Sequence, residues 1–298
     1  MSLRCGESPI NNQHKVFFRS IAIIFLCYFL TACTSLLFQP VKKHNPLPAQ
    51  FNTQLQDFYF SSQDGTKLHG WYLPSQQNPL KPKKTILYLH GNAINISSHL
   101  GGVYWLPEQG YEVYIFDYRG YGKSDGIAFL EGILADIDAA IHYVANQREA
   151  DKKFIVMGHS IGASMGIYVI SQCEKKNQIE SFIAVSAFSD YRTITRDFLS
   201  RNWFTWLLQW PLSLTINNDY RPLDYVSSLS PVPAIFLHGK GDTIIEPHHT
   251  LALYEAAQQP KSISFLRSNH NDIFSYLENR EVILGYLESN DNALFSHH

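Results

Sequence analysis

The sequence predicts an α/β domain with a mostly parallel central sheet, an antiparallel hairpin at its N-terminal edge, helices on both faces and a small helical cap. Three observations carry this prediction. Short apolar runs with the length of buried strands recur along the chain, segments with helical periodicity alternate with them, and a glycine-flanked turn joins one strand to the next helix. Apolar strands that alternate with helices form parallel sheets whose two faces are covered by those helices.

The chain of 298 residues begins with a basic flank followed by an apolar run. Lys15 and Arg19 precede the apolar residues 21–30, an order that is typical of a secretory signal. The next residues, Leu30-Thr31-Ala32-Cys33, resemble the lipobox of bacterial lipoproteins, in which a cysteine preceded by small residues is lipidated. The sequence therefore predicts a signal peptide or membrane anchor over residues 1–32.

Two interpretations of this leader stay open. Cleavage would leave Cys33 as the lipidated first residue, whereas an uncleaved leader would use the uncharged residues 20–41 as a helix long enough to span a bilayer. Positive charge stays on the cytoplasmic side in both cases. We therefore expect the rest of the chain to be tethered to a membrane outside the cytoplasm, in a bacterial cell envelope. Residues 33–55 include several prolines and are expected to form an extended tether.

The predicted domain covers residues 56–290 and is followed by a tail at 291–298. It opens with a hairpin that turns at Asp64-Gly65, a pair that favours tight turns. Strands are predicted at 85–89, 111–116, 154–157, 182–185, 234–237 and 263–266, and helices at 129–147, 161–171 and 272–288. Ligands bind at the carboxyl ends of the strands in such sheets, so functional residues are expected there.

Composition excludes several classes of protein. Hydrophobic residues make up 45% of the chain and charged residues 17%, a balance that supports a large core and disfavours disorder. The net charge of −2 disfavours nucleic-acid binding, which depends on clustered basic residues. Of the four cysteines, Cys5, Cys27 and Cys33 precede the domain, and only Cys173 lies in it. Neither an internal disulfide nor a cysteine zinc site is expected, and we predict no cofactor and no metal.

The turn Gly158-His159-Ser160-Ile161-Gly162 lies between a predicted strand and a predicted helix. A G-x-S-x-G pattern in this setting indicates a nucleophile on a sharp, strained turn at a helix N-terminus. Flanking glycines remove side chains that would clash, and the helix dipole favours negative charge at the serine. We expect Ser160 to be the nucleophile, while the adjacent His159 cannot fold back to take its proton and is expected to pack.

A serine hydroxyl needs a base, and the base needs an acid that orients it. His270 follows the last predicted strand in a polar loop and is the best-placed base. Asp242 follows the preceding predicted strand and is the expected acid, with Asp190 as the alternative and Asp272 as an expected helix cap. The remaining histidines after the nucleophile lie at a strand end, at a helix start or in the tail: His238, His248, His249, His297 and His298.

A tetrahedral intermediate also needs hydrogen-bond donors for its oxyanion. We expect one donor to be the backbone N–H of Ile161, the residue after the nucleophile. The second is expected to be the backbone N–H of Asn92, in the loop that follows the strand at 85–89.

Five motifs in this order resemble the Bem46-like branch of the α/β-hydrolases, over about residues 56–288. They are His90-Gly91-Asn92-Ala93, residues 116–122, residues 158–162, residues 239–242 and His270-Asn271-Asp272. The resemblance implies an α/β-hydrolase fold, a Ser-Asp-His triad and hydrolysis of acyl esters, lysophospholipids or protein thioesters. One departure is Ser268-Asn269 before the histidine, where relatives often carry glycines.

Residues 191–228 interrupt the strand–helix alternation and are rich in tryptophan and phenylalanine. We expect them to form a cap over the site, and the sequence leaves open whether their aromatic face lines an acyl pocket, touches lipid or packs as ordinary core. The expected function is a membrane-tethered serine hydrolase of acyl or lipid-like esters or thioesters. The alternatives are a serine peptidase of the same fold and a catalytically silent binding protein.

Overall fold

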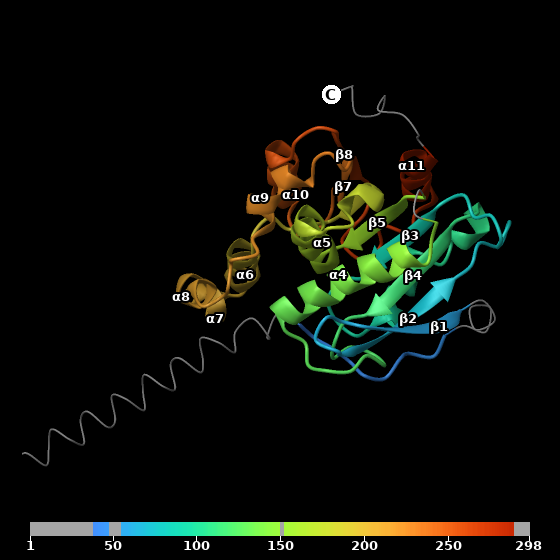
Figure 1. The fold of residues 1–298 in the computed structure, drawn as a ribbon. Helices are drawn as coiled ribbons and strands as arrows, with labels where there is room; N and C mark the ends of the chain where they lie inside the picture. Colours follow the sequence, from blue (N-terminus) through green and yellow to red (C-terminus); the bar gives the residue numbers. More distant parts are fainter. Residues whose placement is uncertain (1–37, 48–54, 150–151, 289–298) are drawn as a thin grey trace, which may run out of the picture.

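The computed structural model describes residues 38–47, 55–149 and 152–288, which build an α/β fold around one twisted sheet (Figure 1). The described part of the sheet has eight strands. They are β1 (Gln56–Ser61), β2 (Lys67–Leu73), β3 (Thr85–Leu89), β4 (Glu112–Asp117), β5 (Phe154–His159), β6 (Ile179–Val185), β7 (Ala234–Gly239) and β8 (Lys261–Leu266).

The strand order is β1-β2-β4-β3-β5-β6-β7-β8. Strand β2 is antiparallel to both β1 and β4, and every other neighbouring pair is parallel. The first hairpin turns where the sequence predicts, because Gly65 adopts a φ of 84° and the Asp64 carboxylate accepts the Thr66 N–H at 3.0 Å. The predicted α/β-hydrolase fold, with a mostly parallel sheet and an antiparallel N-terminal hairpin, is confirmed.

Helices cover both faces of the sheet. One core packs around α4 and α5 with α10, and the other packs around α3 and α11. The helices are α3 (Ile96–His99), α4 (Leu130–Asn146), α5 (Ile161–Gln172), α6 (Tyr191–Ser200), α7 (Trp203–Trp206), α8 (Gln209–Leu214), α9 (Pro222–Tyr225), α10 (Pro247–Ala256) and α11 (Leu277–Glu288), with 3-10 turns at Leu100–Gly102, Pro107–Gln109, Lys176–Gln178 and Val226–Leu229. Helix α11 begins five residues later than predicted, because Asp272 braces the preceding loop instead of capping the helix.

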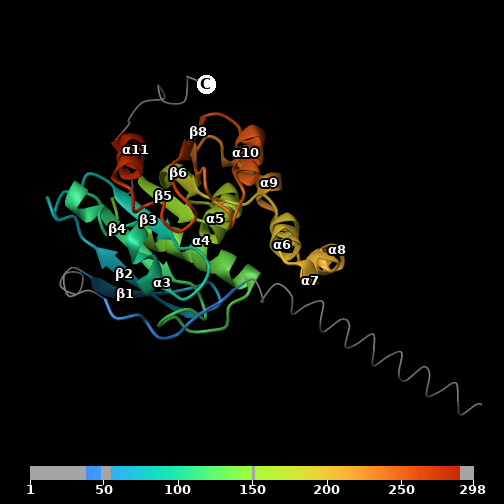
Figure 2. The same cartoon turned by 180° about the vertical axis from the view of Figure 1, so that it is seen from behind.

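Helices α6, α7 and α8 stand away from the sheet in both views (Figures 1 and 2). They carry the aromatic cluster of the predicted cap. Among its side chains, Trp203 is 76% exposed and Trp210 is 61% exposed, so these rings are not part of the core of the domain. Helix α6, by contrast, buries Tyr191 and Ile194 against the domain.

Residues 38–47 run along the domain in an extended conformation. The backbone of Gln39 and Val41 pairs with Ile94, which ties this segment to the loop after β3. The predicted signal or anchor at 1–32, the predicted lipidation site Cys33 and the tail at 291–298 lie outside the described residues. Within the described ranges, no helix has both the length and the apolar character needed to cross a bilayer.

Candidate active site

Ser160 occupies the turn between β5 and α5 in a conformation that L-residues rarely adopt, with φ 56° and ψ −124°. The two flanking glycines explain how this turn fits. A Cβ at Gly158 would lie 2.6 Å from the Cα of Ala163, and a Cβ at Gly162 would overlap the carbonyl oxygens of Leu89 and His90. Helix α5 can therefore approach the sheet closely enough to present Ser160 at its N-terminus.

His270 and Asp242 come together beside this turn. The Nδ1 atom of His270 lies 2.7 Å from the Oδ2 atom of Asp242, and both side chains are almost fully buried. With a proton on Nδ1, the imidazole donates to the carboxylate and its Nε2 is left to accept a proton. Ser160 and His270 line the same pocket, and no hydrogen bond joins their side chains in the described structure. Such bonds are often long in unliganded sites and tighten when substrate binds.

The Asp242 carboxylate is held on its other side by the backbone. Its Oδ1 atom accepts the N–H groups of Ile244 and Ile245, each at 2.9 Å. Burial raises the pKa of Asp242, but the hydrogen bond from His270 and the backbone donors outweigh burial, so its pKa lies below the ordinary value. Asp242 is therefore a carboxylate at neutral pH and can stabilise a positive charge on His270.

The alternative acid, Asp190, has a different role in the structure. Its Oδ1 atom accepts the Thr193 N–H at 2.7 Å and caps α6, while its Oδ2 atom lies 2.6 Å from Arg221 Nε. These contacts fasten the start of the cap. The geometry therefore pairs His270 with Asp242.

Three further side chains support the pair, and sequence reasoning missed them. His159 donates from Nε2 to the carbonyl oxygen of His270 at 3.1 Å, which fixes the backbone of the base. His238 reaches the carbonyl oxygen of Ile245 at 2.9 Å and so supports the Asp242 loop. Asp272 accepts the Asn269 N–H at 2.6 Å, which holds the loop where the sequence departs from its relatives. Their support was not predicted, because a residue type does not reveal which backbone group its side chain contacts, and the partner of His159 is also distant in sequence.

His159 is buried and stays neutral. Burial lowers its pKa far below the ordinary value, and the nearby His270 and His99 lower it further. Its ring centre lies 4.8 Å from that of His270. A neutral ring in this position places no second positive charge beside His270 when His270 takes up a proton.

The loop after β3 places Asn92 at the pocket. The Asn92 side chain braces the loop, because its Oδ1 atom accepts from the Ala93 N–H at 2.7 Å and from the Tyr121 hydroxyl at 3.1 Å. Ile161 is the first residue of α5, where backbone N–H groups have no partner inside the helix. Both expected oxyanion donors thus belong to residues that line the pocket with Ser160.

The pocket has a volume of about 480 Å³ and opens beside the cap. Ser160 and His270 contribute polar side chains to its wall, whereas α6 contributes apolar side chains, among them Ile194, Phe198 and Leu199. Trp203, Trp206 and the other aromatic residues of α7 and α8 do not line it. The aromatic cluster is therefore divided between a pocket wall and an exposed surface.

Comparisons with known proteins agree with this architecture. The family profile described as serine aminopeptidase, S33, matches residues 80–228. The protein YfhR of Escherichia coli K12 is 31% identical over 273 residues, which cover 90% of this chain and 91% of that protein. The protein bem46 of Schizosaccharomyces pombe is 24% identical over 258 residues, covering 85% of this chain and 83% of that protein.

Solved structures share the fold at lower identity. The esterase Pf2001 of Pyrococcus furiosus superposes with a TM-score of 0.66 at 20% identity, covering 83% of this chain and 95% of that one. A thioesterase domain from the curacin biosynthetic pathway superposes with a TM-score of 0.57 at 16% identity, covering 78% of this chain and 99% of that one.

Proposed function

The chain belongs to the α/β-hydrolase family described as serine aminopeptidase, S33, and is an α/β-hydrolase enzyme, and from this premise we propose that it hydrolyses carboxylic esters or thioesters of acyl chains. The observation that carries the proposal is the hydrogen-bonded pair of His270 and Asp242 beside the strained Ser160, in one pocket with an apolar wall.

The proposed reaction passes through an acyl-enzyme. Ser160 Oγ attacks the acyl carbonyl carbon while its proton passes to Nε2 of His270, and Asp242 stabilises the resulting imidazolium. The N–H groups of Ile161 and Asn92 donate to the oxyanion. His270 then gives the proton to the departing alkoxide or thiolate. In the second half a water molecule, deprotonated by His270, attacks the acyl carbon and releases the carboxylic acid and the serine hydroxyl.

The apolar wall from α6 supports an acyl chain as the bound group. Ile194, Phe198 and Leu199 face the pocket that contains Ser160, and together they offer aliphatic and aromatic surface next to the reacting carbon. Esters and thioesters share this acyl half, so the apolar wall does not distinguish an alcohol leaving group from a thiol leaving group. The turnover of both substrate classes has to be measured.

The experiment is a substrate panel on purified protein, with Ser160→Ala beside the wild type. The panel contains p-nitrophenyl esters of increasing acyl length, acyl thioesters and aminoacyl anilides. We expect turnover of esters or thioesters, lost by several orders of magnitude in Ser160→Ala and kept in Ser171→Ala. Ser171 lies on the same helix, and in the described structure its hydroxyl bonds only to Tyr168 and Gln172 of that helix.

Three outcomes would contradict the proposal. Turnover of the anilides alone would favour a serine peptidase, the second function class, to which the family description points. Failure of the wild type to react with a fluorophosphonate probe would favour a silent binding protein. Activity that survives in Ser160→Ala would remove Ser160 from the mechanism.

We also propose that the enzyme is tethered to a membrane outside the cytoplasm, through a lipid on Cys33 or through an uncleaved leader. The apolar run at 21–30 and the lipobox-like residues 30–33 support this. In cell fractionation the wild type should sediment with membranes. Cys33→Ser should become soluble or keep its leader if Cys33 is lipidated, and a wild-type protein found wholly in the soluble fraction would contradict both forms of tether.

The exposed aromatic surface of α7 and α8 supports contact with lipid. Trp203, Phe204 and Trp206 are more than half exposed, and rings of this kind favour the membrane interface. Binding to phospholipid vesicles should weaken when Trp203 and Trp206 are both replaced by serine. Unchanged vesicle binding, with turnover of soluble esters also unchanged, would leave these rings without a lipid role.

A further inference from the structure

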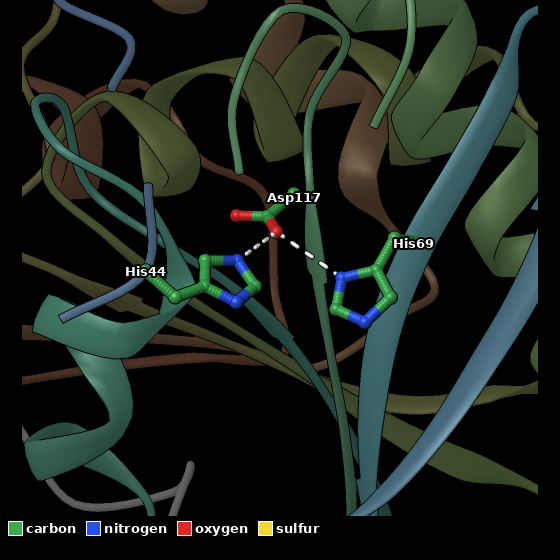
Figure 3. A group of neighbouring side chains, drawn as sticks. All are labelled: His44, His69 and Asp117. Carbon is green, nitrogen blue, oxygen red and sulfur yellow. Dashed lines mark hydrogen bonds and ion pairs between the residues drawn. The ribbon is translucent and has the colours of Figure 1, made fainter. Parts of the chain in front are cut away.

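A second polar cluster lies away from Ser160, where three segments meet. His44 comes from the extended segment 38–47, His69 from β2 and Asp117 from the end of β4 (Figure 3). His44 Nε2 lies 2.8 Å and His69 Nδ1 lies 3.3 Å from the same carboxylate atom, Asp117 Oδ2. His69 and Asp117 are fully buried, and His44 is slightly exposed.

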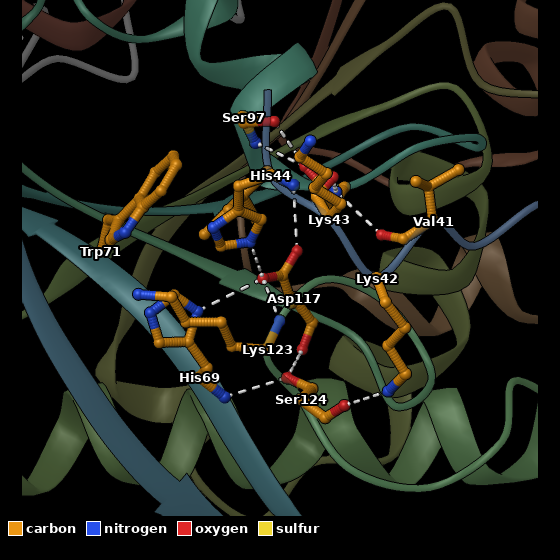
Figure 4. Close-up of polar contacts among 12 residues, drawn as sticks. Val41, Lys42, Lys43, His44, His69, Trp71, Ser97, Asp117, Lys123 and Ser124 are labelled. Atoms are coloured by element: carbon orange, nitrogen blue, oxygen red, sulfur yellow. Dashed lines mark hydrogen bonds and ion pairs between the residues drawn. The ribbon is translucent and has the colours of Figure 1, made fainter. Parts of the chain in front are cut away.

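Each of the two buried members has further partners, and the Ser124 hydroxyl joins them by accepting the backbone N–H of His69 and donating to the backbone carbonyl of Asp117 (Figure 4). The second ring nitrogen of His69, Nε2, lies 2.5 Å from Asp57 Oδ1, which also accepts the indole N–H of Trp71. The other carboxylate oxygen of Asp117 accepts the Ile96 N–H at 3.0 Å. The cluster therefore has three convergent atoms and a surrounding layer of groups that fixes their orientation.

We propose that His44 Nε2, His69 Nδ1 and Asp117 Oδ2 bind a zinc ion, with water as the fourth ligand. Two imidazole nitrogens and one carboxylate oxygen form a zinc ligand set, and all three atoms lie within 4.8 Å of one another. Ligands about 2.1 Å from a tetrahedral ion are about 3.4 Å apart, so small shifts of the side chains suffice. The partial exposure of His44 gives water access to the fourth position.

The contact between His69 and Asp57 fits this ion. A histidine that binds zinc through one ring nitrogen usually donates its other N–H to a carboxylate, and Asp57 stands at that place. Without an ion, both ring nitrogens of His69 face a carboxylate oxygen, Asp57 Oδ1 on one side and Asp117 Oδ2 on the other. A zinc ion between Nδ1 and Asp117 Oδ2 would make both contacts favourable, and the experiment below tests for this ion.

Space at the cluster is kept by a glycine. Gly122 has a φ of 44°, and a Cβ on it would overlap both Asp117 Oδ2 and His44 Nε2. Any larger residue at this position would enter the space where the ligand atoms converge. The backbone N–H of Gly122 also donates to the carbonyl oxygen of Val41 at 3.1 Å, so this residue touches both the cluster and the segment that supplies His44.

Two other groups of potential ligands in the described residues are less suitable. In one, burial raises the pKa of the Cys173 thiol to about 12, so it is a poor ligand beside Asp138 and His142. In the other, which consists of Asp197, His248 and His249, the His248 side chain is exposed and its Nδ1 atom lies 3.5 Å from Glu246, a residue outside the group. They provide matched controls for the experiment.

An ion at this place would fasten the segment 38–47 to the active-site loop. Ala93 and Ile94 both adopt positive φ, 69° and 60°, which is unfavourable for residues with a side chain. The segment holds them there, because Ile94 donates to the Gln39 carbonyl at 2.9 Å and Asn95 Nδ2 donates to the Val41 and Lys43 carbonyls. Loss of the ion would therefore loosen the loop that contains Asn92.

The test uses the full-length protein after treatment with EDTA and removal of the chelator. Titration with zinc by calorimetry should give one tight site per chain, and cobalt in its place should give the absorption of a tetrahedral ion. His44→Ala should bind at least about 100-fold more weakly, and Asp57→Asn about 10-fold to 100-fold more weakly. His142→Ala and His248→Ala should bind as the wild type does.

Stability and proteolysis provide readouts that do not depend on activity. Zinc should raise the melting temperature and protect the chain from cleavage near residue 47 in the wild type, but not in His44→Ala. If His44→Ala does not fold, His44→Gln keeps a polar side chain at this partly exposed position. Absence of a stoichiometric site in the wild type would show that the cluster does not bind zinc, and tight binding that survives in both His44 variants would place the ion elsewhere. Either result overturns the proposal.

Discussion

His90 provides a direct test of how burial governs this site. It lies at the end of β3 without solvent exposure, stacked on Tyr118 at a ring separation of 4.0 Å. Its Nδ1 atom donates to the Gly91 carbonyl at 2.7 Å, while Nε2 has no partner among the described residues. Burial, together with the neighbouring His99, lowers the pKa of His90 to about 3. We predict that replacing this ring makes the protein less sensitive to acid.

The sign and size follow from proton linkage. The unfolded chain takes up a proton on His90 near pH 6.5, whereas the folded chain does so only near the lowered pKa. The stability tied to this ring is therefore complete above pH 6.5 and is lost as the pH falls towards 3. Between pH 6.5 and 5.0 the loss amounts to about 1.5 kcal/mol. His90→Phe keeps the stack on Tyr118 and removes the proton uptake. Between pH 6.5 and 5.0 the unfolding free energy of His90→Phe should therefore fall by about 1.5 kcal/mol less than that of the wild type.

The assay is urea unfolding of both proteins at pH 5.0, 6.5 and 8.0. His90→Phe also loses the hydrogen bond to Gly91, which costs about 1 kcal/mol at every pH and cancels when each protein is compared with itself. Between pH 6.5 and 8.0 the change in unfolding free energy should differ between the two proteins by only about 0.4 kcal/mol. Equal acid sensitivity in both proteins would mean that His90 is already charged in the folded state, and would refute the reasoning.

Two further substitutions probe the base and the turn. Asp242→Asn should lower kcat about 1,000-fold to 10,000-fold with a small change in KM, because an amide cannot stabilise the His270 imidazolium; a loss below 10-fold in steady-state kinetics would argue that Asp242 is dispensable. Gly162→Ala should lower the unfolding free energy by about 3 kcal/mol, because the new Cβ would overlap the carbonyl oxygens of Leu89 and His90. Gly285→Ala, whose Cβ would meet nothing within 4 Å, should be neutral or stabilising in the same urea experiment.

Much of the fold could be predicted because local signals and the sheet agree. Strand β3 matches its predicted bounds, since a strand buried on both faces of a parallel sheet is a nearly continuous apolar run. The start of α11 could not be predicted in the same way. The sequence from residue 272 onward favours a helix. In the structure the Asp272 carboxylate accepts the backbone N–H of Asn269, so Asp272 belongs to the loop and the helix begins at Leu277.

The candidate site also contains residues that the sequence predicted and contacts that it did not. Ser160, Asp242 and His270 follow strand ends, and a parallel sheet brings such positions to one edge, so the motif around Ser160 and the topology together predicted the group. The support from His159 could not be foreseen, because its partner is a backbone carbonyl 111 residues away. His44 was equally hidden, since prolines around it indicate an extended tether and say nothing about which loop the tether contacts.

Strain connects these two outcomes. Ser160, Ala93 and Ile94 all hold positive φ, and each such residue costs about 1–3 kcal/mol. Strand β5 and helix α5 hold Ser160 in place, and both were visible in the sequence. Ala93 and Ile94 have no regular element around them, so the segment 38–47 supplies the hydrogen bonds that hold them. It follows that the nucleophile should tolerate loss of this segment better than the oxyanion loop does, because the two are held by separate parts of the chain.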